Sequence, residues 1–224
     1  MTIVEWETKL LEWISKDIDL VKKHVKKGDT YIDIGANTGL FTKVLIDRLG
    51  GDCNFFSNVI LFEPIKKYYD ECIIKFKNYD NVLVENIGLS DDDNVKVIYA
   101  SQENYGYNKI YKDGMEIHPH ELYEIKPLTF SDWIKGKNYP KIDFIKIDAE
   151  GHDTNILFGM LDWFKETNNR PKIMFESNWY GFEENKIINI LCDEFQYVKI
   201  ESDEIAYNET LLINSQDFEV SQDT

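Results

Sequence analysis

The sequence predicts a doubly wound α/β domain, with a mainly parallel sheet covered by helices on both faces. Short apolar runs alternate with segments of helical periodicity along most of the 224 residues. The runs are almost continuously apolar, which is typical of strands buried on both sides of a parallel sheet. The last two runs, 196–201 and 210–214, have too short a connection for a crossover helix, so we expect an antiparallel pair. This length suits a single domain over 1–224.

The first predicted element is an amphipathic helix over residues 4–26, where apolar residues recur at intervals of three and four. We expect residues 1–28 to cover a sheet face or part of a ligand pocket. Residues 31–42 then read as strand, tight turn and helix. Gly35 and Gly39 lack side chains, so another molecule can lie against the turn, and the next helix points its amide end at that molecule.

Further strands and helices follow in alternation. The strands are predicted at 59–64, 81–88, 94–100, 142–148 and 172–176, and the helices at 40–49, 68–76, 128–134, 156–164 and 183–194. Residues 102–126 break this rhythm and form a long irregular insertion rich in tyrosine, which we expect to contact an acceptor substrate. His118 and His120 lie in this loop, without partners at zinc-ligand spacing, as surface or acceptor-contacting residues.

Composition argues against several classes of function. The formal net charge of −16 repels polyanions, so no nucleic-acid partner is expected. No apolar run approaches about 18 residues, and the first residues lack the pattern of a signal peptide, so we expect no membrane span and no leader. Cys53, Cys72 and Cys192 are widely spaced, as reduced thiols of a cytoplasmic protein would be. The sequence leaves the oligomeric state unknown.

Acidic residues end four of the predicted strands, namely Asp33, Glu63, Asp148 and Glu176. The carboxyl ends of parallel strands meet at one edge of the sheet, where open α/β folds bind their ligands. We therefore expect a shared ligand site there. The structural alternative, which stays most open for Glu176, is that each acid caps the helix that follows its strand.

The pattern around Gly35 and Gly39 narrows the ligand. It is Gly-x-x-x-Gly, so the pyrophosphate fingerprint G-x-G-x-x-G is missing, and the chain has no G-K-[ST] phosphate loop. A ligand with a ribose but no phosphate fits better. Glu63 is placed to accept hydrogen bonds from two ribose hydroxyls, and Asp33 is placed to meet a cationic group. A nucleoside that carries an amino acid, such as S-adenosylmethionine, satisfies both.

Four segments resemble, in order and spacing, the motifs of the FkbM family of S-adenosylmethionine-dependent methyltransferases. They are Asp33–Gly39, Phe62–Pro64, Asn86–Ser90 and, most specific of all, Ile145–Asp153 with the sequence IKIDAEGHD. The resemblance implies a Rossmann-like class I methyltransferase fold with seven strands, the last antiparallel. It also implies O-methylation of a small molecule, commonly a sugar or glycan hydroxyl, or a hydroxyl of a non-sugar secondary metabolite.

The strand ends and these motifs together predict the cofactor-binding residues. They are Asp33, Gly35, Asn37, Gly39, Phe41, Glu63, Pro64, Asn86, Gly88 and Asp148. Acceptor choice is expected to lie outside the motifs, in the N-terminal helix, the 102–126 insertion and the tail after about 180.

Methylation of a hydroxyl requires a base or a metal ion to take its proton. His152 is the first candidate base and Asp148 the second predicted catalytic residue, while the alternative for His152 is a helix cap or a backbone contact. Asp148 and Glu176, with Asn178 nearby, offer oxygen ligands that suit Mg²⁺ or another divalent cation. Their alternative is a set of solvated or capping carboxylates.

Two rival functions remain open on the sequence. A dinucleotide-dependent oxidoreductase would share the strand–turn–helix unit, although the third glycine of its fingerprint is missing. A cofactor-binding module without catalysis would keep the cofactor residues and leave every acceptor unmethylated.

Overall fold

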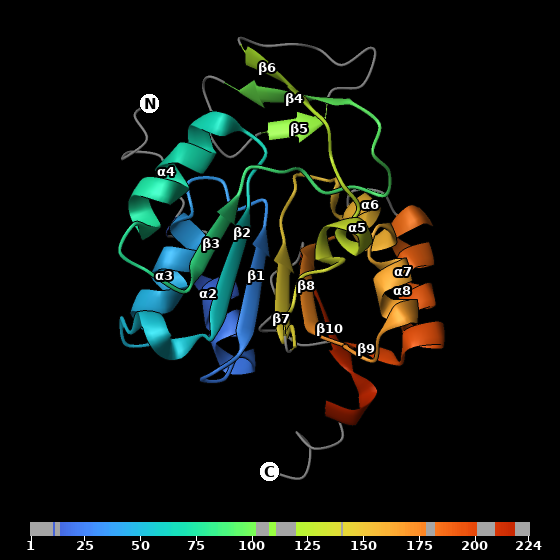
Figure 1. Ribbon diagram of the computed structural model, residues 1–224. Helices are drawn as coiled ribbons and strands as arrows, with labels where there is room; N and C mark the ends of the chain where they lie inside the picture. Colours follow the sequence, from blue (N-terminus) through green and yellow to red (C-terminus); the bar gives the residue numbers. More distant parts are fainter. Residues whose placement is uncertain are drawn as a thin grey trace.

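The computed structural model describes residues 11, 14–101, 108–110, 120–139, 141–177, 182–200 and 209–217. Over these residues the chain forms one large sheet, covered by helices on both faces, and one small sheet that lies across its end (Figure 1). None of the helices in this part of the chain is long and apolar enough to cross a membrane.

Seven strands form the large sheet. They are β1 (Thr30–Ile34), β2 (Asn58–Phe62), β3 (Val82–Glu85), β7 (Phe144–Ile147), β8 (Lys172–Glu176), β9 (Tyr197–Ile200) and β10 (Glu209–Asn214), in the spatial order β3-β2-β1-β7-β8-β10-β9. The pairs from β3 to β8 are parallel, and β10 runs antiparallel to both β8 and β9. The predicted fold class is confirmed, including the antiparallel last strand.

Helices cover the two faces of this sheet. On one face lie α2 (Ser15–His24), α3 (Leu40–Arg48) and α4 (Lys66–Phe76), and on the other α5 (Phe130–Ile134), α6 (Asp153–Phe158), α7 (Leu161–Glu166) and α8 (Phe182–Phe195) (Figure 1). Successive strand residues point to opposite faces. Thus Tyr31 packs with α2 and α3, whereas Ile32 and Ile34 join the core beneath the other four helices.

Two of the predicted helices differ from the structure. The helix predicted at 156–164 is two short helices, α6 and α7, which meet at Gly159 and Met160. A Cβ atom on Gly159 would lie 2.1 Å from the backbone oxygen of Ser90, so this close approach requires glycine. Of the helix predicted at 4–26, the structure describes Ser15–His24 as α2, and residues 1–10, 12 and 13 lie outside the described part.

The small sheet has the order β5-β4-β6 and consists of β4 (Lys96–Ser101), β5 (Asn108–Ile110) and β6 (His120–Ile125). The predicted strand at 94–100 is therefore real but belongs to this second sheet. The expectation of an irregular insertion was wrong for β5 and β6, because both pair antiparallel with β4 and pack apolar side chains on Ile65 and Tyr68. His120 begins β6, whereas His118 lies outside the described residues.

The chain enters and leaves the small sheet at one narrow attachment, where Gly88–Ser90 lies beside Leu128. The backbone N–H of Ser90 donates to the carbonyl of Leu128 at 3.0 Å, and the N–H of Leu128 donates to the carbonyl of Gly88, also at 3.0 Å. Leu89 and Leu128 form an isolated parallel bridge between these bonds. From this attachment the sheet extends across the carboxyl ends of the central strands (Figure 1).

Candidate active site

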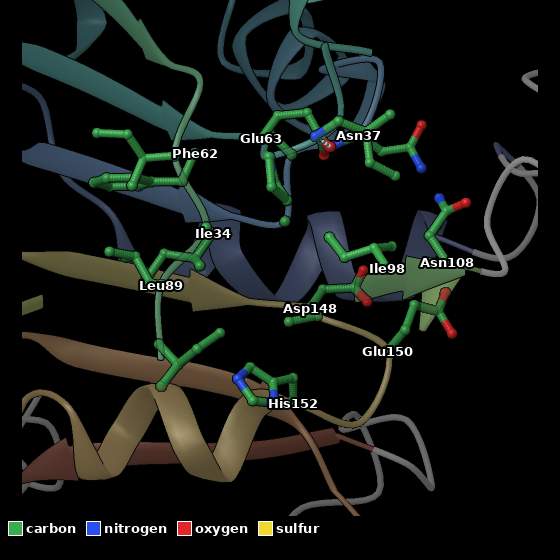
Figure 2. A pocket seen from close by; sticks show the side chains of 18 of the residues that line it. Ile34, Asn37, Phe62, Glu63, Leu89, Ile98, Asn108, Asp148, Glu150 and His152 are labelled. Carbon is green, nitrogen blue, oxygen red and sulfur yellow. Dashed lines mark hydrogen bonds between the residues drawn. The ribbon is translucent and has the colours of Figure 1, made fainter. Parts of the chain in front are cut away.

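A cavity lies where the carboxyl ends of β1, β2 and β7 face the small sheet (Figure 2). Eight predicted site residues line it, namely Gly35, Asn37, Phe41, Glu63, Pro64, Gly88, Asp148 and His152. Four others do not line it, namely Asp33, Gly39, Asn86 and Glu176. Asn178 lies outside the described residues. The small sheet contributes Ile98, Asn108, Ile110 and Ile125 to the wall.

The turn after β1 is shaped by contacts within the protein. Gly35 has φ +82°, and a Cβ atom there would lie 2.0 Å from the backbone oxygen of Asp148, so β1 and β7 approach too closely for any side chain. Gly39 has φ +74°, and its Cβ atom would lie 2.7 Å from the Phe76 ring. Gly39 is therefore needed for packing α3 against α4, and Gly35 alone of the two faces the cavity.

Glu63 closes one end of the cavity. It is buried, and its Oε2 accepts the backbone N–H of Asn37 while its Oε1 accepts that of Ile65, both at 2.8 Å. Burial raises the pKa of the Glu63 carboxyl to about 7, although the two amides oppose this shift. Asn86 supports the residue from behind, because its Nδ2 donates to the backbone oxygens of Glu63 at 2.8 Å and Pro64 at 3.0 Å.

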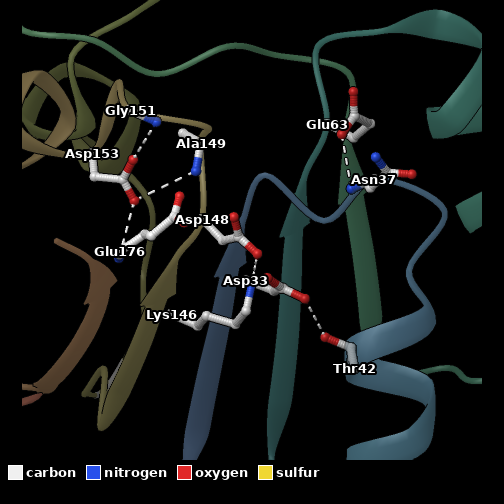
Figure 3. A network of polar contacts seen from close by, with 10 residues as sticks. All are labelled: Asp33, Asn37, Thr42, Glu63, Lys146, Asp148, Ala149, Gly151, Asp153 and Glu176. Atoms are coloured by element: carbon white, nitrogen blue, oxygen red, sulfur yellow. Dashed lines mark hydrogen bonds and ion pairs between the residues drawn. The ribbon is translucent and has the colours of Figure 1, made fainter. Parts of the chain in front are cut away.

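Asp33 is fully buried beneath the cavity floor (Figure 3). Its Oδ2 accepts the hydroxyl of Thr42 at 2.6 Å, and its Oδ1 lies 3.3 Å from Nζ of Lys146. The cation that Asp33 meets is thus a lysine of the same chain. Lys146 also reaches Oδ2 of Asp148 at 3.2 Å and lies 4.7 Å from the centre of the Phe41 ring.

Lys146 links the buried part of the site to the exposed part. Burial opposes its charge, but the carboxylates of Asp148 and Asp33 outweigh burial and hold the pKa of Lys146 well above its usual range. Lys146 therefore stays charged and holds one oxygen of Asp148. No sequence pattern marks Lys146 on its own, although it lies in the predicted strand that ends at Asp148.

Asp153 fixes the loop between β7 and α6. Its Oδ2 accepts the N–H of Gly151 at 3.1 Å, and its Oδ1 accepts those of Ala149 at 3.4 Å and Glu176 at 3.3 Å (Figure 3). Burial, with added repulsion from Asp148, raises the pKa of Asp153 to about 7. Asp153 was not among the predicted site residues, because an acid in the first turn of a helix has an ordinary capping explanation.

Glu150 is a cavity residue that the sequence did not single out. It has φ +51° and lines the cavity, as Asn108 of β5 also does (Figure 2). Burial, followed by the charges of Asp148 and Glu176, raises the pKa of Glu150 to about 9, so it holds a proton at neutral pH. The prediction selected only the acid directly after β7, which is Asp148. The left-handed backbone at Glu150, which turns this side chain toward the cavity, cannot be read from the sequence.

His152 lies on the side of the cavity across from Glu63 and Asn37 (Figure 2). It occupies the N-cap position of α6 but makes no side-chain capping bond, so the capping alternative does not hold. Its Nε2 lies 2.9 Å from Oγ of Ser90, a fully buried residue that follows β3. Ser90 was part of a recognised motif but was not predicted as a site residue.

Of the predicted metal ligands, Asp148 and Glu176 are among the described residues and Asn178 is not. Within the described ranges, no group of three or more His, Cys, Asp or Glu side chains is arranged to hold a metal ion. Asp148 is engaged by Lys146, and the Glu176 side chain does not line the cavity.

Comparison with known proteins places the chain among methyltransferases. A family model described as the methyltransferase FkbM domain matches residues 33–203, which confirms the resemblance of the sequence motifs. The curated relative named hexuronic acid methyltransferase AglP, from Haloferax volcanii, is 23% identical over 168 residues. The match covers 73% of this chain and 63% of that protein, so the chain spans less than two thirds of the relative's length.

Solved structures share the fold. Methyltransferase FkbM from Methylobacillus flagellatus KT superposes with a TM-score of 0.51 at 16% identity, over 84% of this chain and 44% of that chain. A candidate rRNA methylase from Clostridium thermocellum gives 0.50 at 13% identity, over 89% and 92%. These identities show the fold alone. Because that fold also occurs in a candidate rRNA methylase, the expectation of no nucleic-acid partner rests only on the net charge.

Proposed function

Because the chain belongs to the methyltransferase FkbM domain family, we propose that it transfers a methyl group from S-adenosylmethionine to a hydroxyl of a sugar or glycan. One observation carries the proposal. A single cavity joins a buried carboxylate suited to ribose hydroxyls, Glu63, to the candidate base His152 on the other side. The curated relative named for hexuronic acid methylation supports a sugar as the acceptor.

The cavity fits the proposed cofactor. Each oxygen of Glu63 uses one lone pair on a backbone amide, which leaves a second for a ribose hydroxyl. The wall beside Glu63 is apolar, with Phe62, Ile65, Ile87 and Leu89, as a flat adenine ring requires. Asp33 contributes indirectly, through the lysine that it holds.

The chemistry divides between cofactor and protein. When bound, S-adenosylmethionine supplies a methyl group on a cationic sulfur; the acceptor oxygen bonds the methyl carbon, sulfur keeps the electron pair of the broken bond, and the hydroxyl proton is released. In our proposal His152 binds that proton. Asp148, held by Lys146, orients the acceptor hydroxyl, and Glu150 donates a hydrogen bond from its protonated carboxyl.

Acceptor selection is assigned to the small sheet. Ile98, Asn108, Ile110 and Ile125 reach the cavity from outside the large sheet, and together they form a wall that the cofactor residues do not provide. Ile14, at the start of α2, adds a further apolar contact from the N-terminal side. This wall offers an acceptor apolar area and one amide, that of Asn108.

Calorimetric titration with S-adenosylmethionine and its demethylated product tests cofactor binding. We expect Glu63→Ala to weaken binding by about 1.5–3 kcal/mol, on the order of 10- to 100-fold, because hydrogen bonds to a charged group are lost. Glu85→Ala is the matched control, since Glu85 ends the neighbouring strand β3 and does not line the cavity. If the unaltered protein bound neither compound, the proposal would be wrong.

A radiolabelled methyl-transfer screen tests the acceptor. Neutral sugars, uronic acids, nucleotide sugars, glycan extracts and RNA are offered in parallel, with and without EDTA. We expect label in sugar or glycan fractions, with activity retained in EDTA because a protein base takes the proton. Label in RNA would refute the acceptor class, and loss of activity on chelation would favour a divalent cation held with Asp148 and Glu176.

A further inference from the structure

Ser90 and its neighbour Asp91 reach His152 from the segment after β3, at the attachment of the small sheet. We infer that Ser90 and Asp91 are positioning residues that keep the His152 proton on Nε2, so that Nδ1 is the basic nitrogen. The tautomer follows from the two contacts of the Ser90 hydroxyl. Only its use in catalysis rests on the proposed function.

The direction of two hydrogen bonds fixes the tautomer. Oγ of Ser90 lies 2.9 Å from Oδ1 of Asp91 and 2.9 Å from Nε2 of His152. A hydroxyl has one proton, and a carboxylate oxygen can only accept. The Ser90 proton therefore points to Asp91, because the reverse arrangement would leave two bare oxygens facing each other. Nε2 must then carry a proton and donate it to Ser90.

Asp91 is itself held as an acceptor. Its Oδ1 also receives Nδ2 of Asn155, on α6, at 3.1 Å. Two donors thus converge on one oxygen, which leaves no room for a proton there. His152 is the N-cap residue of α6 and Asn155 lies in the first turn of the same helix, three residues later. The N-terminal end of α6 therefore holds both the imidazole and the amide that binds the Asp91 carboxylate.

The relay is rigid at its centre. Ser90 is fully buried, its backbone N–H donates to Leu128 at 3.0 Å, and its carbonyl oxygen lies against Gly159. Its hydroxyl therefore has little freedom to move away from His152. In proteins generally, the hydrogen bond made by one ring nitrogen of a histidine determines which of the two nitrogens carries the proton.

The relay also suits the proposed reaction. When Nδ1 binds the proton released by the acceptor hydroxyl, the ring becomes an imidazolium that still donates from Nε2 to Ser90. The Ser90 hydroxyl stays on the Asp91 carboxylate, so no proton moves along the relay. A negative charge lies two hydrogen bonds from the new positive one, whereas in serine-protease triads the carboxylate bonds the imidazole directly.

Nitrogen-15 NMR of the whole protein tests the tautomer without any acceptor. The long-range proton–nitrogen pattern of His152 is assigned by its loss in His152→Ala. We expect the Nε2–H form in the unaltered protein, a mixture in Ser90→Ala, and a shift toward Nδ1–H in Asp91→Ala, where the freed Ser90 proton donates to Nε2. An Nδ1–H form in the unaltered protein overturns the inference.

Kinetics then tests whether the relay acts through His152. We expect Ser90→Ala to lower kcat on the order of 10- to 100-fold in the unaltered background and to change nothing further in His152→Ala. Ser131→Ala is the control, because its buried hydroxyl donates to the Gly159 carbonyl at 2.8 Å and accepts the backbone N–H of Trp163 at 3.0 Å. It should lose stability and keep kcat.

The outcomes separate this inference from the proposed function. Equal losses from Ser90→Ala in both backgrounds would make Ser90 merely structural and overturn the positioning role. If the protein bound no S-adenosylmethionine yet His152 showed the Nε2–H form, the proposed function would fail while the tautomer assignment stood.

Discussion

Lys146 is a buried cation between two carboxylates that serve different parts of the molecule. Asp33 lies in the core next to Thr42, whereas Asp148 is partly exposed in the cavity. A buried ion pair adds little net stability when it forms, but removing one partner leaves an uncompensated charge. Because Lys146 bonds both carboxylates, the position of Asp148 in the cavity depends on the buried contact between Lys146 and Asp33.

Replacing the lysine measures this dependence. We expect Lys146→Met to lower the free energy of unfolding by about 3–5 kcal/mol, because Asp33 is left buried without its cation. Adding Asp33→Asn should recover part of the loss. Lys43→Met, which breaks the partly exposed pair with Asp47, should cost less than about 1 kcal/mol. Urea denaturation measures all three, and similar costs at Lys146 and Lys43 would contradict the argument.

Single residues show where sequence reasoning succeeds and where it stops. Glu63 and His152 were predicted because each follows a strand that is recognisable by composition, and both line the cavity. Asp33 was predicted to contact a ligand cation, yet side-chain packing gives it Lys146 instead. Glu150 and Ser90 lie in two of the motifs but were not selected, because the sequence shows neither the left-handed backbone of Glu150 nor the contact of Ser90 with a residue 62 positions away.

At the scale of elements, the strand–turn–helix unit of β1 and α3 depends on one close approach. Gly35 and Gly51 both have positive φ, at +82° and +71°, but only Gly35 has a backbone oxygen 2.0 Å from its would-be Cβ atom. Gly51 has nothing within 4 Å. Substitution of Gly51 therefore measures the free-energy cost of backbone strain alone, whereas substitution of Gly35 measures that strain together with a steric clash.

Alanine at these two glycines gives a matched pair. We expect Gly51→Ala to cost about 1–2 kcal/mol, the strain of a left-handed residue. Gly35→Ala should cost about 3 kcal/mol or more and weaken cofactor binding, because β7 must move away from the turn. Thermal unfolding and calorimetry provide the readouts. Equal stability losses at the two sites would show that the approach of β7 is not limiting.

The small sheet is the element that the sequence predicted least well. β4 was recognised by its alternation, but β5 has only three residues and β6 carries charged residues among its apolar ones. Neither is stable alone, since both acquire their pairing partners from β4 and their core from α4. The strands of the large sheet were easier to predict, because short and almost continuously apolar runs are typical of strands buried on both faces of a parallel sheet.

At the scale of the whole molecule, burial of acids makes stability depend on pH. Burial raises the pKa of Asp17 to about 6, of Glu63 and Asp153 to about 7, and of Glu150 to about 9. In the unfolded chain such carboxyls lose their protons near pH 4. Between these limits the folded protein holds more protons than the unfolded one. Its free energy of unfolding therefore falls as pH rises.

Thermal unfolding across pH checks this sign. We expect a higher melting temperature at pH 5 than at pH 8, and the net charge of −16 should act in the same direction through self-repulsion. Glu63→Gln should make the melting temperature depend less on pH below about pH 7, because the Glu63 carboxyl no longer titrates. A melting temperature that rises between pH 5 and pH 8 would contradict the raised pKa values of these buried carboxyls.

The narrow attachment at Gly88–Ser90 and Leu128 has a consequence for how this enzyme can change. The described residues between 91 and 127 pair with no strand of the large sheet, and they are held by the two backbone hydrogen bonds of this attachment and by packing on α4, so this segment can be exchanged without altering any strand of the large sheet. Ser90 stands at that junction and touches His152. A graft that brings in a different acceptor wall therefore also resets the alignment of the base, and specificity and turnover vary together.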